Sequence, residues 1–218
     1  MSRTKFGGLV VASLAVVCFV AAYARSQDKP AAHDKHAGQD KPAAGSPMMD
    51  ESMMKAWMEA SAAGPQHKQL ERMAGKFKYV NKWRMDPSSE WTVTEGDYDG
   101  EMCMGGRFLH TSVKGPMMGM TFEGIGALGY DNVLKKHVAA WIDNMGTGIM
   151  RSEGTSDAGG NTITFEGEMM CPMEHTNKPY KYQYEVKSND EFTMRWWGPS
   201  MTDKMMFESM VITYTRVK

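Results

Sequence analysis

Seventeen residues near the middle of the chain contain two patterns with chemical meaning. Residues 115–131 read GPMMGMTFEGIGALGYD. Within them, residues 124–129 spell G-x-G-x-x-G, the pattern of a dinucleotide-binding turn. Met117, Met118 and Met120 come just before it, and thioether sulfur is a ligand that selects Cu(I). The stretch therefore raises two hypotheses, a nucleotide site and a soft-metal site.

The nucleotide hypothesis depends on the element that comes after the glycines. The fingerprint binds pyrophosphate where a strand turns into a helix, whose N-terminus meets the phosphates. Here residues 130–132, Tyr-Asp-Asn, read as a turn, and residues 136–143 then read as another strand. No helix opens, so the pattern favours a strand whose glycines allow a bend or a close approach. We expect this strand to form a hairpin arm, with its turn at Gly115-Pro116.

The methionines have two interpretations. Methionine is a flexible core filler and lines adaptable apolar surfaces, and the sequence favours this role. The alternative is a Cu(I) site built from Met117, Met118, Met120 and His110. We otherwise predict no metal site and no cofactor.

Several strand-like runs carry isolated charges on faces that are otherwise apolar. Glu208 alternates with Met210 and Tyr214, Arg195 lies between Met194 and Trp196, and Glu123 shares a face with Ile125. A buried carboxylate needs a cation or several donors, so a Glu208–Arg195 pair is expected. The opposing interpretation is that these charges face solvent or form a structural pair. The candidate ligand-binding residues are Glu123, Trp141, Arg195, Glu208 and Tyr214.

Catalytic motifs are absent from the sequence. It contains no G-x-S-x-G and no H-E-x-x-H, so no catalytic residue is predicted and enzyme activity stays open. His110 and His137 fall on separate strands, where a hydrogen-bonded or exposed histidine is the favoured interpretation over a ligand. Asp143 precedes Asn144-Met145-Gly146, which favours a turn role.

The elements that must position these residues are mostly strands. From Phe77 onward, apolar and polar residues alternate in about ten short runs separated by turn signals, which predicts an antiparallel up-and-down β-barrel. Two short helices precede it within residues 51–75, the second opening at Pro65. The apolar stripe Met53, Met54, Trp57 and Met58 on the first helix suits a cap over a barrel mouth.

Longer stretches resemble a known family. The run MMGMTFEGIGALGYDNVLKKHVAAWIDNMGTGIMRSEGT is similar to the core signature of the bacterial DUF1579 family, whose function is unassigned. GRFLHTSVKG, ITYTR and Leu70…Gly75-Lys76-Phe77 match as well, with Phe77 where the family usually has Trp. The resemblance covers about Leu70 to Arg216. It implies a calycin-like barrel, related in architecture to lipocalins, and no particular catalytic mechanism.

The N-terminal quarter differs in character. Residues 1–24 have a basic start, an apolar run and an A-x-A site, which predicts a signal peptide cleaved near Ala24 and a periplasmic or secreted protein. Residues 25–50 lack periodicity and are expected to be a disordered linker, before the helical segment 51–75 and the barrel domain 76–218. The net charge of −1 gives no footprint for nucleic acid, and no span is expected in the mature chain.

Export places Cys103 and Cys171 where disulfides are permitted. In a strict meander their turns fall at opposite ends of the barrel, so we expect no bridge between them. The sequence thus predicts an exported barrel that binds a small apolar or amphipathic ligand. The alternatives are a methionine-rich periplasmic copper-binding protein and an enzyme on a barrel scaffold. The oligomeric state is not predicted.

Overall fold

The computed structural model describes residues 50–218. The predicted signal peptide, residues 1–24, lies outside the described residues, as does the predicted linker except for its last residue. Within the described range, no helix combines the length and the apolar character needed to cross a membrane.

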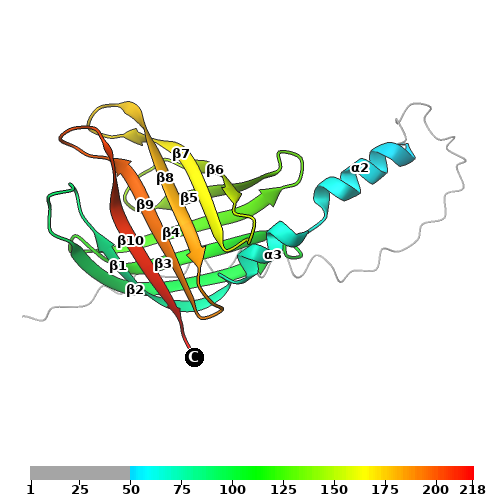
Figure 1. The fold of residues 1–218 in the computed structure, drawn as a ribbon, viewed down its shortest axis with the longest axis horizontal. Helices are drawn as coiled ribbons and strands as arrows, with labels where there is room; N and C mark the ends of the chain where they lie inside the picture. Colours follow the sequence, from blue (N-terminus) through cyan, green and yellow to red (C-terminus); the bar gives the residue numbers. More distant parts are fainter. Residues whose placement is uncertain (1–49) are drawn as a thin grey trace, which may run out of the picture. The chain divides into compact units, whose positions relative to one another are not determined.

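Ten antiparallel strands form a closed barrel, as predicted (Figure 1). Each strand pairs with the next, and β1 closes the barrel by pairing with β10. Alternate residues therefore point inward along every strand, and closure gives each strand a partner on both sides. The strands are β1 (Gly75–Trp83), β2 (Thr92–Cys103), β3 (Phe108–Met117), β4 (Met120–Asp131), β5 (Lys136–Asp143), β6 (Met150–Ser156), β7 (Thr162–Cys171), β8 (Thr176–Val186), β9 (Glu191–Pro199) and β10 (Met206–Arg216).

Two helices precede the barrel, α2 (Glu51–Ser61) and α3 (Pro65–Glu71). Asp50 caps α2, since its Oδ1 accepts the N–H of Met53 at 2.8 Å. Pro65 opens α3 as predicted. The expectation that the α2 stripe caps a barrel mouth is wrong, because α2 buries no residue and Trp57 is 65% exposed.

The barrel end beside α3 is closed by this helix and the segment that follows it. Leu70 and Met73 are fully buried, and the Met73 carbonyl accepts the hydroxyl of Tyr98 at 2.9 Å. Arg216 of β10 lies over the Phe77 ring at 4.4 Å and donates to the Ala74 carbonyl at 2.9 Å. These contacts hold the helix and the segment after it as a plug, because side chains of β2 and β10 satisfy the backbone acceptors of that segment.

The other end, which we call the mouth, is formed by the turns after β1, β3, β5, β7 and β9. The β3–β4 turn consists of Met118 and Gly119, with φ of 49° and 79°. Positive φ at both positions is the pattern of a type I′ hairpin turn. The expected turn at Gly115-Pro116 is wrong, because both residues lie within β3.

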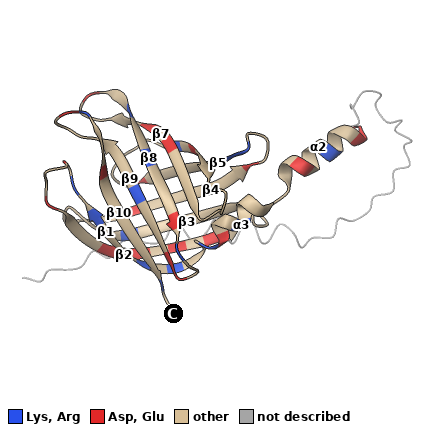
Figure 2. Ribbon diagram, in the orientation of Figure 1, with Lys and Arg blue, Asp and Glu red and all other residues tan. Residues whose placement is uncertain are grey.

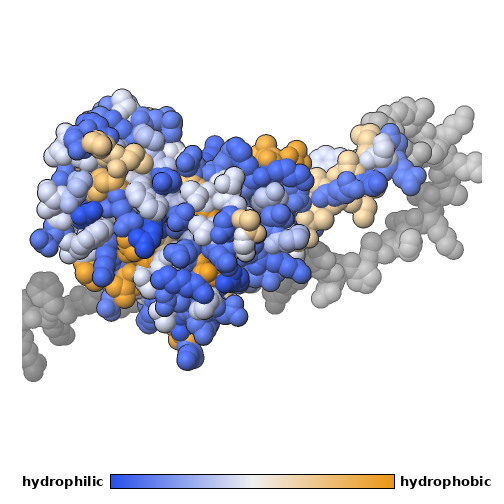
Figure 3. All heavy atoms as spheres, viewed as in Figure 1, coloured by the Kyte–Doolittle hydropathy of each residue, from blue (hydrophilic) through white to orange (hydrophobic). Residues whose placement is uncertain are grey.

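The outside of the barrel is polar and mixed in charge. Lysines, arginines and carboxylates intermingle along the strands in view (Figure 2), and the same face is mostly hydrophilic with scattered apolar patches (Figure 3). Lys114–Glu123 and Lys136–Glu153 are cross-strand pairs of this surface, at 2.7 and 2.6 Å. Such exposed pairs each add about 0–1 kcal/mol to stability.

Cys103 ends β2 at the closed end, and Cys171 ends β7 at the mouth. Both thiols are free. Successive turns of a meander alternate between the two ends of the barrel, and this alternation separates Cys103 from Cys171, as expected.

Candidate functional site

A cavity of about 310 Å³ lies inside the barrel, on the mouth side of the core. The closed half is filled instead by fully buried side chains such as Phe77, Leu109 and Phe165. The volume is at the small end of the range for small-molecule sites. The cavity is lined by Tyr79, Asn81, Thr94, Tyr98, Thr111, Val113, Pro116, Met117, Phe122, Leu128, Ala139, Ala140, Trp141, Asp143, Met145, Met150, Ser152, Met169, Tyr180, Tyr182, Tyr184, Met194, Trp196, Met210, Ile212 and Tyr214.

One wall of the cavity is a stack of aromatic rings from β8 and β9. Trp196 stacks on Tyr180 with centroids 4.6 Å apart and on Tyr182 at 5.5 Å, with interplanar angles of 16° and 7°. Tyr182 and Trp196 are register partners, so the antiparallel pairing of the strands places the rings face to face. The stack presents rigid, flat surface to the cavity.

Polar side chains interrupt the apolar lining, and three positions among them matter for binding. Ser152 and Tyr182 share a hydrogen bond of 2.7 Å. The indole N–H of Trp141 donates to Asp143 Oδ2 at 2.8 Å, while Asp143 Oδ1 accepts the N–H of Met145. The third, Asn81, is 4% exposed, and its Oδ1 has no partner among the described residues. An unpaired buried acceptor costs about 1–3 kcal/mol, so Asn81 offers a contact to a bound molecule.

The cavity tyrosines stay uncharged. Burial raises the pKa of Tyr184 to about 12. Burial likewise raises the pKa values of Tyr98, Tyr182 and Tyr214 well above their ordinary range. Their hydroxyls are therefore neutral hydrogen-bonding groups at physiological pH.

The glycines of residues 124–129 have a packing role. A Cβ on Gly124 would overlap Cζ2 of Trp141, and one on Gly126 would stand 2.7 Å from Thr111 Oγ1 and 3.0 Å from Trp141 Cε3. The Trp141 indole lies against the β4 backbone, and only glycine leaves it room. The G-x-G-x-x-G pattern thus makes space for a ring, consistent with the strand interpretation.

The structure separates the five predicted ligand-binding residues into two groups. Trp141 and Tyr214 line the cavity. Glu123 lies on the outer face and pairs with Lys114. Arg195 and Glu208 form the expected pair at 3.0 Å, but on the outer face, with their side chains 40% and 28% exposed.

A β-bulge explains the position of Glu208. Glu208 pairs with Trp197 and Met210 pairs with Trp196, so Ser209 is an extra residue in β10. The bulge shifts the alternation by one residue. Glu208 consequently leaves the inward face that strict alternation assigns to it together with Met210 and Tyr214.

The residues of the alternative Cu(I) site do not gather at one place either. Met117 lines the cavity, whereas Met118 and Met120 are 62% and 54% exposed at the mouth. His110 is exposed on the outer face of β3, opposite Glu101 and Ala127. Among residues 50–218, no three histidine, cysteine or carboxylate side chains gather as a metal site.

His137 is fully buried beyond the cavity, between Tyr130 and Phe165. Neither of its ring nitrogens makes a hydrogen bond of standard geometry within the described chain. Burial lowers the pKa of His137 to about 4, with a weaker opposing contribution from the Gly129 backbone. The residue is neutral at physiological pH and has a core position.

The family follows from sequence comparison. Residues 62–216 match the family described as "Protein of unknown function (DUF1579)". The chain belongs to the DUF1579 family. No curated protein is significantly similar to it in sequence.

Solved structures share the fold. Rv2717c from M. tuberculosis superposes with a TM-score of 0.51 at 13% identity, covering 72% of this chain and 100% of the other. The S-type phycobiliprotein lyase CPES from Guillardia theta superposes with a TM-score of 0.53 at 11% identity, covering 74% and 97%. At these identities the likeness establishes the lipocalin-like barrel of this DUF1579 member and nothing about its ligand.

Sequence reasoning passed over several cavity residues. Asn81 lies between Tyr79 and Trp83 on one strand face, so the criterion that selected Glu208 would also have selected it. Tyr182 lies in an evident alternation, but no local pattern shows that it stacks on Trp196. Asp143 has the expected turn contact to Met145 and, in addition, lines the cavity.

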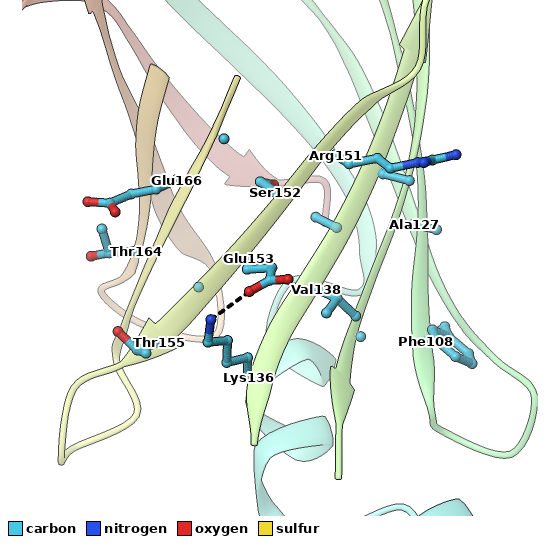
Figure 4. A pocket seen from close by; sticks show the side chains of 15 residues that line it. Phe108, Ala127, Lys136, Val138, Arg151, Ser152, Glu153, Thr155, Thr164 and Glu166 are labelled. Carbon is cyan, nitrogen blue, oxygen red and sulfur yellow. Dashed lines mark hydrogen bonds and ion pairs between the residues drawn. The ribbon is translucent and has the colours of Figure 1, made fainter. Parts of the chain in front are cut away.

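A second concavity lies on the outside of β4 to β7 (Figure 4). It is wide, about 820 Å³, and open, and the Lys136–Glu153 ion pair crosses it. Arg151 and Glu166 add further charges, which water can solvate there. The interior cavity is the stronger candidate, because it is more enclosed and more apolar than the outer concavity and contains an unpaired buried acceptor.

Proposed function

We propose that this protein binds a small, largely apolar molecule inside the barrel. The observation that carries the proposal is the cavity of about 310 Å³, whose aromatic and methionine lining contains the unpaired Oδ1 of Asn81. A cavity with so few polar groups favours an apolar body with a hydrogen-bond donor. One structural relative is named a lyase, but no residue arrangement in the described chain favours a reaction over binding.

Titration with N-phenyl-1-naphthylamine, an uncharged dye that fluoresces in apolar surroundings, tests the proposal. Ala139→Leu fills the cavity from inside and should weaken dye binding about tenfold or more. Ala127→Leu is the matched control, because Ala127 lies on the outer face of β4. Equal dye affinity in both variants, or no saturable binding by the native protein, would remove the proposal. Mass spectrometry of the natively produced protein would then identify a co-purified molecule.

A second candidate function is soft-metal binding at the mouth. Every turn at the mouth carries at least one exposed methionine. In the closed-end turns of residues 50–218, Met104 alone is an exposed methionine. Thioethers select Cu(I). The exposed mouth methionines are Met85, Met118, Met120, Met145, Met170, Met173, Met201, Met205 and Met206.

Anaerobic titration with Cu(I) tests this second candidate. The double variant Met118→Leu/Met120→Leu should reduce the metal bound or its affinity. Met53→Leu/Met54→Leu on α2 removes two other exposed thioethers, each 49% exposed and away from the mouth, and should leave uptake unchanged. Uptake that is absent, or that falls equally in both variants, would exclude a mouth site.

The location of the protein is a further part of the proposal. We infer export to the periplasm or the exterior from the basic start, the apolar run and the A-x-A site of residues 1–24. The mass of the mature N-terminus, expected near residue 25, tests it. Recovery of the uncleaved chain from the cytoplasm would exclude export.

A further inference from the structure

The charge of the cavity lining narrows the class of ligand. Asp143 is the charged residue among the lining residues of the described chain, and that lining includes no lysine, arginine or histidine. An anion placed there would lose its hydration without gaining a cation, at a cost of several kcal/mol. A carboxylate or phosphate head group therefore has no counterion within this cavity.

The aromatic part of the lining presents electron-rich ring faces. The faces of Trp141, Trp196 and the tyrosine rings carry the negative side of the aromatic quadrupole, which attracts organic cations. Both oxygens of Asp143 accept one hydrogen bond each, from Trp141 and Met145, and a carboxylate oxygen has room for another. Asn81 Oδ1 adds an unpaired acceptor on a different strand. Each of these groups attracts a donor or a positive charge.

Asp143 is well placed to hold a cation. Its hydrogen bonds to Trp141 and Met145 fix the carboxylate orientation, since both come from residues two positions away on the same strand and turn. The Trp141 ring is in turn fixed against Gly124 and Gly126. An ammonium group over the face of this indole would be attracted by the ring quadrupole, and the carboxylate at the N–H edge of the same ring adds an opposite charge.

We propose that the cavity selects an organic cation, a molecule with a protonated or quaternary amine next to Asp143 and Trp141 and an aromatic or apolar body among the stacked rings. This inference rests on the proposed function and names the class of its ligand. A barrel that carries an anionic lipid needs a basic residue inside to pair with the head group, and the described lining of this cavity has none.

The affinities of three small probes of similar size, measured by isothermal titration calorimetry and by quenching of tryptophan fluorescence, test the inference. Phenyltrimethylammonium is the cation, tert-butylbenzene is its uncharged isostere and benzoate is an anion. We expect the cation to bind about tenfold more tightly than the isostere, and benzoate to show no saturable binding. Asp143→Asn should weaken binding of the cation about five- to tenfold and leave the affinity for the isostere unchanged.

Asp131→Asn is the matched control, because Asp131 accepts the N–H groups of Val133 and Leu134 in a comparable turn at the closed end. It should leave all three affinities unchanged. Binding of the isostere as tight as that of the cation, or saturable binding of benzoate, would overturn the inference while the proposed function stands. Failure of all three probes and of the uncharged dye would overturn both.

Discussion

The indole ring of Trp141 lies directly on Gly124, so that no side chain fits at this position of β4. The two residues come from neighbouring strands, and the Trp141 ring, which lines the cavity, covers the Gly124 backbone. This contact links the glycine pattern of the sequence to the shape of the candidate site.

Gly124→Ala should therefore destabilise the protein by about 1–3 kcal/mol, because the added methyl group displaces the Trp141 ring. Urea unfolding followed by circular dichroism measures the change. Gly146→Ala is the control, since a Cβ at Gly146 meets nothing within 4 Å, and its effect should stay within about 0.5 kcal/mol. Equal stability of the two variants would show that the ring is free to move.

His137 should make the protein less stable in mild acid. Its pKa is about 4 in the folded protein and about 6.5 in the unfolded chain. Between these values the unfolded state binds more protons, so the free energy of unfolding falls as the pH falls from about 6.5 to 4, by at most about 3 kcal/mol. His67 and Tyr130, which face this part of the core, belong to the same cluster.

The measurement is the unfolding free energy as a function of pH. His137→Leu should flatten the profile between pH 4 and 6.5, whereas His110→Leu, which removes an exposed histidine, should keep the native slope. Carboxylates such as Glu174, whose pKa its two lysine partners lower to about 2, act at lower pH. An unchanged slope in His137→Leu would assign the acid sensitivity to other groups.

The Arg195–Glu208 pair should contribute little to stability and nothing to the cavity. Both side chains are partly exposed and lie on the outer face. Glu208→Gln should cost less than about 1 kcal/mol and change the affinity for the uncharged dye less than twofold. A loss of affinity as large as that expected of Ala139→Leu would mean that the pair reaches the ligand.

Met118 occupies a turn position that suits asparagine better. A non-glycine residue is strained at positive φ, and asparagine is among the least strained there. Met118→Asn should stabilise the protein by about 0.5–1 kcal/mol, measured by thermal or urea unfolding. Met120→Asn makes the same change in a strand, where asparagine is disfavoured, so it should give no gain. Destabilisation by Met118→Asn would point to a packing role for the Met118 side chain.

Much of the fold was predictable because strand alternation and turn chemistry are local. The alternation of Phe122, Gly124, Gly126 and Leu128 placed these residues on one face, and the meander of short runs predicted the barrel. The hairpin turn was misplaced by a few residues, because Pro116 reads as a turn signal although its missing N–H is tolerated in β3.

The candidate site was only partly predictable, since it depends on relationships between strands. Trp141 and Tyr214 were found as members of apolar faces. Glu208 was placed with them by strict alternation, and one extra residue, Ser209, moved it to the outer surface. Nothing local distinguishes a bulge residue from any other exposed serine.

The sequence by itself determined the strands, the two short helices and the family, because alternation, turn residues and glycine spacing act over a few neighbouring positions. Only the tertiary structure decided which end is plugged and which is open, that Tyr180, Trp196 and Tyr182 stack into one wall, and that Asp143 is the charge inside the cavity. Those facts depend on register and barrel closure, which join residues tens of positions apart. The same closure gathers scattered methionines at the mouth and leaves Asn81 without a partner among the described residues inside.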